Sequence, residues 1–184
     1  MGRTDPSLTE TGILHAHRLA RRLKRLVASA APPLPILSSP ARRAMETARL
    51  ATEWIGSSIQ PDADLWEIDF GKWEGMNFQE IVDANPELVN EWAKGEMDFR
   101  FPAGERLSAF QERVARAGYR MRNQGEEMLI VVTHGGIIRF LICYFLGLPP
   151  QSHLMFEISP GSITRIHLYD DSGAVLAGLN DFDF

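Results

Sequence analysis

The sequence predicts an α/β fold with a largely parallel sheet, and three observations favour this class. Apolar residues recur with a period close to 3.6 along residues 9–30, which is typical of an amphipathic helix. Two uncharged runs, Leu34–Ser38 and Met128–Val132, are typical of short strands that are buried on both faces. Helical and strand patterns then alternate along the chain, as they do in α/β proteins.

Length and composition limit the class of protein. The chain has 184 residues, a formal net charge of −5 and 45% hydrophobic residues, which is an ordinary balance for one globular domain with a core. No apolar run reaches the ~20 residues of a membrane-spanning helix, and the first ten residues are too polar for a signal peptide. An acidic chain is a poor general binder of nucleic acid. We expect a cytoplasmic single domain (residues 1–184) with no membrane or nucleic-acid partner.

The N-terminal part is expected to hold a helix, a strand and a second helix. The first helix spans residues 9–30 and is followed by a proline-rich connector (residues 31–35) that overlaps the start of the first strand. Ser39 is predicted as the N-cap of the second helix and Pro40 as its first helical residue. That helix is expected to end near Gly56, because glycine commonly ends helices.

Residues 65–102 are less regular and rich in aromatic side chains. They include three tryptophans and two predicted short helices, Asn77–Ala84 and Pro86–Lys94. Such an excursion between regular elements is typical of a lid or pocket wall, which we expect at about residues 70–104. An excursion that only packs on the core is an equally open alternative.

The C-terminal part is expected to alternate helices and strands. A helix runs from residue 105 to about Asn123, and an apolar helix (Ile137–Leu146) follows the second of the two uncharged strands. Three short strands are expected to close the chain: Leu154–Ile158, Ser162–Tyr169 and Ala174–Leu179.

The turn Thr133-His134-Gly135-Gly136 joins a buried strand to a helix. Such a turn places backbone N–H groups and the positive end of the helix at the carboxyl edge of a parallel sheet, which is a site for an anion. His134 lies at this edge, and the two glycines let the backbone approach a ligand closely. A capped, purely structural histidine is an equally open interpretation.

The segment from Ser38 to Arg43 likewise joins the end of a predicted strand to the start of a predicted helix, and it places arginines in the first turn of that helix. Arginine matches phosphate with two parallel hydrogen bonds. Because successive helix residues point ~100° apart, only one of Arg42 and Arg43 is expected to face a pocket.

Residues 65–75 place three carboxylates, Glu67, Asp69 and Glu74, among aromatic side chains. A carboxyl beside Trp66 and Phe70 would be partly desolvated, which raises its pKa and suits it to give a proton to a leaving group. Taken one at a time, each of the three is expected to be an ordinary surface carboxylate.

Together these segments resemble the histidine phosphatase superfamily, which includes the cofactor-dependent phosphoglycerate mutases. The pattern Leu-x-Glu-x-Asp-Phe-Gly-x-Trp-Glu-Gly at residues 65–75 is most similar to that of α-ribazole phosphatase-like members. Further matches at residues 2–9, 102–105 and 160–164 extend the resemblance over nearly the whole chain. It implies a phosphoglycerate mutase-like, three-layer α/β/α sandwich with a mostly parallel central sheet that lacks the family's first strand.

The resemblance also implies a function and a set of site residues. It implies a phosphatase that hydrolyses a small phosphate monoester through a phosphohistidine intermediate, with α-ribazole phosphatase-like or broad specificity and without metal or cofactor. Arg43 matches the pocket arginine, Glu67 the general acid and His134 the second histidine, which stabilises the transferring phosphoryl group. Gly135 would offer its N–H to a phosphate oxygen. A homodimer is compatible with the sequence, which leaves the oligomeric state open.

The family's nucleophile is missing from this sequence. It is the histidine of an Arg-His-Gly motif at the end of the first strand, and no such motif occurs here. His15 and His17 lie in the first predicted helix and face different directions, so they do not replace it. Loss of a strand next to residues 128–132 would leave backbone groups unpaired. We expect a mis-set or truncated start, a nucleophile upstream of Met1, and little activity from residues 1–184 alone.

Three other functions are alternatives to this phosphatase. A non-catalytic phosphate-ligand binding or regulatory protein that keeps the pocket is the main alternative. A mutase is disfavoured because the segment between Gly75 and Pro102 is short for a longer lid. A metal hydrolase using His134, His153 and His167 lacks both the His-Glu-x-x-His pattern and a ligand-spaced cluster.

Four further residues carry smaller expectations. The single cysteine, Cys143, excludes an intrachain disulfide and is most simply a buried thiol. Arg106 stands where family members often have serine, and it either contacts phosphate or is exposed. His153 and His167 are expected at the surface or at a sheet edge.

Overall fold

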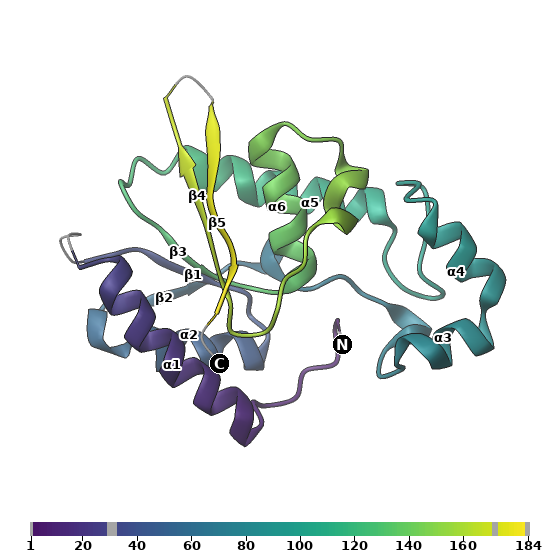
Figure 1. Ribbon diagram of the computed structural model, residues 1–184, viewed down its shortest axis with the longest axis horizontal. Coiled ribbons are helices and arrows are strands. Elements are labelled where there is room, and N and C mark those ends of the chain that lie inside the picture. Colours follow the sequence, from purple (N-terminus) through teal and green to yellow (C-terminus); the bar gives the residue numbers. More distant parts are fainter. Residues whose placement is uncertain (1, 29–32, 171–172, 183–184) are drawn as a thin grey trace.

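A small parallel sheet lies at the centre of the protein, which is described by a computed structural model over residues 2–28, 33–170 and 173–182 (Figure 1). Strand β1 (Ile36–Ser38) pairs in parallel with β2 (Ile59–Pro61) on one side and with β3 (Ile130–Val132) on the other. Strands β4 (Ile163–Leu168) and β5 (Ala174–Asp181) form a separate antiparallel hairpin. The expected parallel sheet is therefore confirmed for β1 to β3, whereas the C-terminal strands are antiparallel.

Helices cover both faces of the sheet. Figure 1 shows α1 (Glu10–Leu26) and α2 (Arg42–Thr52) on one side of the strands and α5 (Leu107–Arg122) and α6 (Gly135–Leu146) on the other. Strand side chains alternate between these layers, because successive residues of a strand point to opposite faces. This arrangement is the predicted three-layer α/β/α order, and it explains why β1, β2 and β3 contain no charged residue.

Two hydrophobic clusters fill the space between the layers. Ile36 and Ile130 pack with Val27 on the side of α1. Leu37 and Val131 pack against the larger cluster, which includes side chains of α5 and α6. Strands β1 and β3 therefore contribute to both layers of the core.

The sheet is interrupted between β3 and β4. Within the described residues, β3 has β1 as its strand partner on one side, and β4 pairs with β5 alone. The outer edge of β3 therefore carries backbone groups without a strand partner, in a strand whose side chains pack on both faces.

The helix ends depart from their predicted positions in two places. Helix α1 begins as expected after Thr9, whose hydroxyl accepts from the Gly12 amide, but it ends at Leu26; the expected end at Ala30 and part of the connector lie outside the described residues. Helix α2 begins at Arg42 with Ala41 as N-cap, so the prediction that Ser39 is the N-cap was wrong. The Ser39 hydroxyl accepts from the Ala41 amide instead and lies in the turn before the helix.

Two strand predictions failed for different reasons. Strand β2 was missed because it is three residues long and ends in a proline, which weakens any strand pattern. The strand expected at Leu154–Ile158 does not form, and the 3₁₀ helix η4 (Pro150–Met155) overlaps its first two residues. Met155 is 80% exposed, so the apolar run does not mark a buried strand.

The excursion forms the short helices α3 (Phe78–Ala84) and α4 (Pro86–Ala93), close to their predicted bounds. Asn77 and Glu80 cap α3 reciprocally, and Pro86 begins α4. Figure 1 places both helices at the opposite end of the molecule from α1. Aromatic rings that meet edge-to-face join the excursion to the core: Phe70, Trp73, Phe99 and Phe101.

No helix in the described part of the chain is both long enough and apolar enough to cross a membrane.

Candidate active site

His134 lies at the carboxyl end of β3 and is the N-cap of α6. Its Nε2 is 2.8 Å from the Ser39 hydroxyl, and its Nδ1 is 3.4 Å from Nη2 of Arg43. Because a guanidinium only donates, Nδ1 accepts and the ring proton lies on Nε2, which donates to Ser39. Burial, and then the charge of Arg43, lower the pKa of His134 from 6.5 to about 3. The imidazole is therefore neutral at pH 7.

Arg43 points inward from the first turn of α2, whereas its neighbour Arg42 points outward. The Arg43 side chain is 16% exposed, and that of Arg42 is 63% exposed and paired with Glu46 at 3.0 Å. Of the two arginines, only Arg43 is therefore turned into the protein, and its place in a phosphate pocket stays a prediction. Arg43 donates to the carbonyl oxygens of Gly2 at 2.8 Å and Thr4 at 2.7 Å.

Glu67 is buried against the first turn of α6. Its carboxylate accepts from the amides of Gly136 and Ile68, both at 3.0 Å. A side chain at position 136 would collide with this carboxylate, so the glycine allows the approach. Burial raises the pKa of Glu67, although the two amide hydrogen bonds oppose that rise. The expectation of a desolvated carboxyl is confirmed, and that of an ordinary surface carboxylate was wrong for this residue.

The structure thus brings Arg43, Glu67 and His134 together at one edge of the sheet, which we call the anion site. Arg43 follows β1 and His134 follows β3, and the carboxyl ends of parallel strands meet at the same edge. The Gly135 amide is the first of α6, at an end where no side chain caps the helix. A cation, a neutral imidazole, a buried carboxyl with a raised pKa and a helix N-terminus therefore lie together, an arrangement suited to a phosphate group.

Arg113 was not singled out from the sequence, yet it fixes the loop that carries Glu67. It is buried and binds both carboxylate oxygens of Glu105, at 2.8 and 2.9 Å. It also donates to the carbonyl oxygens of Glu67 at 3.0 Å and Trp66 at 2.5 Å. The signal in the sequence is an arginine three residues after Phe110, on the apolar face of α5.

Glu74 was expected to be an ordinary surface carboxylate, and this was wrong. It accepts from the amides of Gly2 and Arg3 at 2.9 Å and from the Thr4 hydroxyl at 2.7 Å. Burial pushes the pKa of Glu74 up, but the hydrogen bonds from Thr4, Gly2 and Arg3 outweigh it and lower the pKa from 4.5 to about 2. Glu74 therefore anchors the N-terminal segment (residues 2–5), whose carbonyls in turn hold Arg43.

Asp69 and Arg106 lie in local contacts. The Asp69 carboxylate accepts from the Gly71 amide at 2.8 Å and so stabilises the turn that follows it. Arg106 is 44% exposed and pairs with Asp98. Of the two expectations for Arg106, a phosphate contact or exposure to solvent, the structure shows exposure.

The remaining histidines and the cysteine lie elsewhere. His15 packs against Gly161, and His17 and His167 are exposed. His153 was expected at the surface, but it is buried, with its ring 4.4 Å from that of Phe140. Cys143 is buried, as expected. In the part of the chain that the structure describes, no group of three or more His, Cys, Asp or Glu side chains is placed to hold a metal ion.

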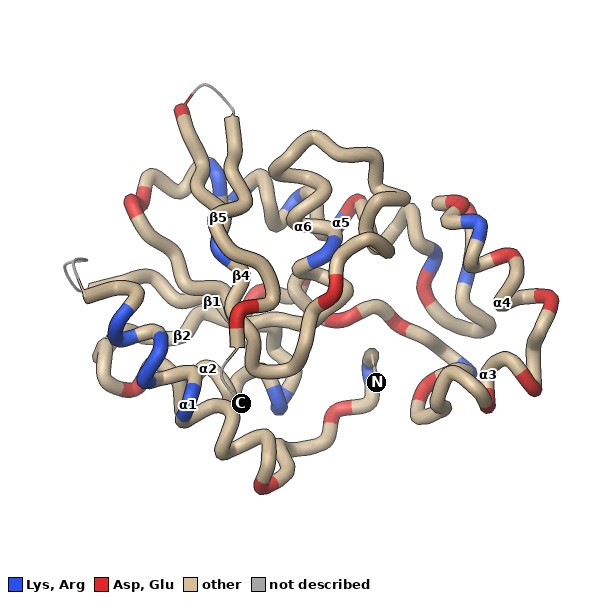
Figure 2. The backbone as a smooth tube through the Cα atoms, in the orientation of Figure 1, with Lys and Arg blue, Asp and Glu red and all other residues tan. Residues whose placement is uncertain are grey.

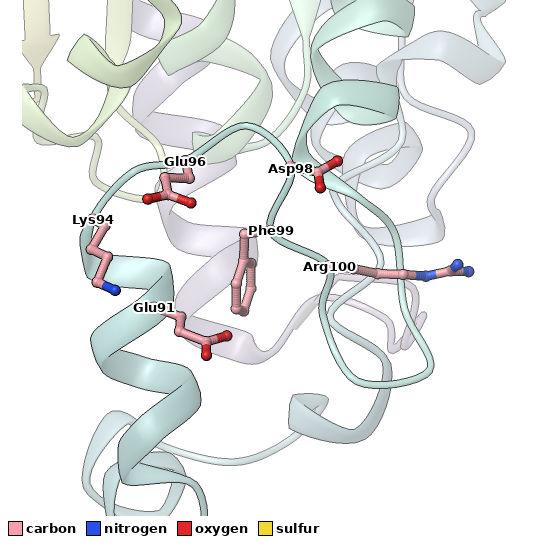
Figure 3. Close-up of a pocket in the computed structure, with 6 residues that line it drawn as sticks. All are labelled: Glu91, Lys94, Glu96, Asp98, Phe99 and Arg100. Atoms are coloured by element: carbon pink, nitrogen blue, oxygen red, sulfur yellow. The ribbon is translucent and has the colours of Figure 1, made fainter.

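A hollow in the excursion does not suit a phosphate. It has a volume of about 310 Å³, and Figure 3 shows the ring of Phe99 with three acidic side chains and Lys94 around it and Arg100 directed away. Helices α3 and α4 carry acidic residues and no Lys or Arg (Figure 2). The negative charge of this end of the molecule favours the sheet edge, where Arg43 lies, as the place for an anion.

Comparison with known proteins agrees with this geometry. The family model described as the histidine phosphatase superfamily (branch 1) matches residues 1–181. The chain belongs to this superfamily. The resemblance drawn from the motifs at residues 65–75 and 132–136 is thereby confirmed.

Individual members of the histidine phosphatase superfamily are moderately similar. Phosphoserine phosphatase 1 from Hydrogenobacter thermophilus is 28% identical over 176 residues, which are 95% of this chain and 81% of that protein. Phosphoglycerate mutase-like protein 4 from Arabidopsis thaliana is 29% identical over 92% of this chain and 72% of that protein. The crystal structure of the α-ribazole phosphatase from Shigella flexneri covers 98% of this chain and 87% of its own, with 27% identity and a TM-score of 0.81.

Proposed function

We propose that this protein hydrolyses a small phosphate monoester through a phosphohistidine intermediate, with α-ribazole phosphatase-like or broad specificity. The observation that supports this most is the convergence of Arg43, Glu67 and His134 on one edge of the sheet. The phosphatase names of similar superfamily members, for phosphoserine and α-ribazole phosphate, support the same reaction class.

Each group has a role in the proposed reaction. Arg43 and His134 bind the phosphoryl oxygens, and the Gly135 amide donates a further hydrogen bond. A nucleophilic histidine attacks phosphorus while the bond to the leaving oxygen breaks, and Glu67 gives its proton to that oxygen. Water then attacks phosphorus, the P–N bond breaks, and the Glu67 carboxylate takes the proton from water. A pKa raised by burial suits Glu67 to both steps.

We assign the nucleophile to a segment that precedes Gly2. Among the histidines of this chain, all of which are described, His134 is the one that contacts Arg43. Gly2 is buried beside Phe70 and bonded to Arg43, so a preceding segment would enter the anion site directly. The free edge of β3 offers backbone partners for a strand in such a segment. We therefore propose that residues 1–184 alone have little phosphatase turnover.

The experiment compares turnover of 4-nitrophenyl phosphate by residues 1–184 and by a chain extended with the residues encoded in frame upstream of Met1. We expect turnover from the extended chain, abolished by changing the histidine of an upstream Arg-His-Gly motif, and insensitive to a metal chelator. Brisk turnover by residues 1–184 would show that the nucleophile has been assigned wrongly.

A phosphate-ligand binding protein is the second candidate, favoured by the same absence of a second histidine at the described anion site. An in-frame stop codon directly upstream of Met1, together with binding of orthovanadate without turnover, would support it over the enzyme.

We further propose that the excursion at about residues 70–104 is a wall of the substrate pocket. It begins about three residues after Glu67, and Glu74 within it is bonded to the N-terminal segment at the anion site.

A further inference from the structure

Glu67 lies on a stretch of chain that has no regular secondary structure of its own. Residues 66–70 belong to neither a helix nor a strand, and they follow the 3₁₀ helix η2 (Ala63–Leu65). Glu67 is buried, and backbone carbonyls in a buried irregular stretch need hydrogen-bond donors from elsewhere. The source of these donors therefore decides where the Glu67 carboxylate lies, including its 3.0 Å contact with the Gly136 amide.

Arg113 supplies these donors from α5, and all five N–H groups of its guanidinium are used. Nη1 donates to the carbonyl oxygens of Asp64 at 2.8 Å and Trp66 at 2.5 Å, and Nη2 donates to that of Glu67 at 3.0 Å. The other two N–H groups bind both oxygens of the Glu105 carboxylate, at 2.8 and 2.9 Å. A planar guanidinium fixes these acceptors relative to one another, and it has no N–H group left for a substrate.

Glu105 holds the chain on the other side of Glu67. Its Oε2 accepts from the Asp69 amide at 3.2 Å, and its own amide donates to the Asp69 carbonyl at 2.9 Å. The Arg113 and Glu105 side chains are 8% and 15% exposed, so the ion pair is largely buried. Hydrogen bonds between such charged groups are strong and directional. The Arg113–Glu105 pair therefore holds the backbone both before and after Glu67.

The same pair affects the electrostatics around Glu67. Burial raises the pKa of Glu67, and its two amide hydrogen bonds and then the charge of Arg113 oppose that rise. The Glu105 carboxylate lies at hydrogen-bond distance from Arg113 and carries the opposite charge, so it offsets the effect of the guanidinium on Glu67. Removal of the Glu105 charge would therefore lower the pKa of Glu67.

We propose that the Arg113–Glu105 pair positions Glu67 for proton donation, by holding its carboxyl at hydrogen-bond distance from the leaving oxygen of a bound phosphate ester. This inference rests on the proposed function, in which Glu67 gives its proton to that oxygen. A general acid must lie ~2.6–3.2 Å from the atom that it protonates, and a displacement of about 1 Å can cost ~100-fold in rate. Arg43 and His134 are carried by other elements, so loss of the pair would impair proton donation more than phosphate binding.

The first test compares two substrates in the extended chain. Arg113→Lys keeps a positive charge but loses the planar set of five donors. It is expected to lower turnover of glycerol 3-phosphate, whose leaving group needs a proton, about tenfold more than turnover of 4-nitrophenyl phosphate. A residue that only stabilises the fold would slow both substrates equally. The matched control is Arg116→Lys, at an exposed arginine of the same helix, and it is expected to leave the ratio of the two turnover numbers unchanged.

A double variant shows whether Arg113 acts through Glu67. In Glu67→Gln the proton donor is already lost, so adding Arg113→Lys is expected to slow glycerol 3-phosphate by less than about a further threefold, as for residues that act as one unit. A further loss of about tenfold in the double variant would show that Arg113 acts independently of Glu67, and this would overturn the proposal.

The second test is a direct titration of Glu67, which needs no nucleophile. Glu105→Gln preserves the size of the side chain, removes its charge and leaves the guanidinium uncompensated. Carboxyl carbon NMR of residues 1–184 is expected to show a lower pKa for Glu67 in this variant than in the wild type. Glu112→Gln, at an exposed glutamate next to Arg113 in α5, is expected to leave that pKa unchanged. If Arg113→Lys does not fold, Glu105→Gln replaces it in the turnover comparison, with a loss expected in the same direction.

The outcomes separate this inference from the proposed function. If the extended wild-type chain turns over neither substrate, the proposed function is wrong, and the titration alone judges the Arg113–Glu105 pair. An unchanged pKa of Glu67 in Glu105→Gln would overturn the role of the pair. Equal slowing of both substrates in Arg113→Lys would also overturn it, while the phosphatase activity stands.

Discussion

Glu67 and Glu74 are seven residues apart in one segment, and the fold treats them in opposite ways. Glu67 is buried and accepts two amide hydrogen bonds, and its pKa is raised because desolvation dominates. Glu74 is more exposed, and its pKa falls to about 2 because hydrogen bonds from Thr4, Gly2 and Arg3 outweigh its desolvation. The comparison teaches that the balance between burial and donors, rather than residue type, sets the protonation of a carboxyl.

The same difference divides the anion site into two functional parts. Glu67 is suited to hold and release a proton. Glu74 is a permanent anion that anchors the N-terminal segment, and this segment holds Arg43 through the carbonyls of Gly2 and Thr4. In the proposed reaction, Glu67 therefore serves proton transfer, and Glu74 serves the placement of the arginine that would stabilise phosphate charge.

The largest expected effect comes from removing the charge-stabilising part itself. Arg43→Ala or His134→Ala, in the extended chain that carries the nucleophile, should lower turnover by ~10²–10³-fold, as loss of a preorganised stabiliser does. The matched control is Arg42→Ala, because Arg42 is the adjacent arginine and points into solvent. Near wild-type turnover in Arg43→Ala, or an equal loss in Arg42→Ala, would remove Arg43 from the site.

Breaking the anchor should destabilise the protein. Glu74→Gln is expected to lower the free energy of unfolding by about 1.5–3 kcal/mol, the range for hydrogen bonds to a charged group. Because the folded pKa of Glu74 is lowered, its stabilisation is present above pH 4.5 and is lost as the pH falls toward 2. Urea unfolding at pH 7 and pH 3 measures this, with Glu126→Gln, an exposed glutamate, as control. An equal difference at both pH values would contradict the anchoring role.

Glu67→Gln should affect the pH dependence of stability in the opposite sense. Burial raises the pKa of Glu67 in the folded protein above its pKa in the unfolded chain. The contribution of Glu67 to stability is therefore complete at a pH below the unfolded-state pKa, and it is lost as the pH rises through the folded-state pKa. The variant should therefore gain stability relative to wild type between pH 4 and pH 8, which the same urea series measures. A difference that does not change over this range would contradict the raised pKa.

The general-acid role of Glu67 has a separate test. In the extended chain, Glu67→Gln should slow an alkyl phosphate more than 4-nitrophenyl phosphate, because a poor leaving group needs the proton. The ratio of the two turnover numbers, compared between variant and wild type, is the measurement. Equal slowing of both substrates would argue against proton donation by Glu67.

The smallest expected effect is a change in the protonation of His134 when an anion binds. The pKa of His134 is about 3 in the free protein, because of burial and then the charge of Arg43. A bound orthovanadate anion supplies the opposite charge and should raise this pKa. Nitrogen NMR of the imidazole over a pH series, with and without vanadate, measures the shift. A downward shift or none would place the anion away from His134.

Much of the fold could be predicted because its signals are local. The amphipathic period of α1, the Asn77 and Glu80 cap of α3 and the uncharged runs of β1 and β3 depend on neighbours in the sequence. Strand β2 and η4 were predicted wrongly because a three-residue strand and an exposed apolar run carry little local information.

The candidate site was predictable only in part. The turn at His134 and the first turn of α2 indicated an anion site because strand–turn–helix junctions have a known geometry. The roles of two residues were missed: Arg113 and Glu74. The partners that each of them contacts at the site lie tens of residues away in the sequence.

Residue order was therefore enough to identify an α/β protein of the histidine phosphatase type and the turns that we propose to bind an anion, since periodicity and motifs are properties of short stretches of chain. The charge state of each acid and base required the folded chain. Burial of Glu67, the donors gathered around Glu74 and the arginine beside His134 come from segments distant in sequence. Solvation and electrostatic energy depend on distance in space, and only folding sets those distances.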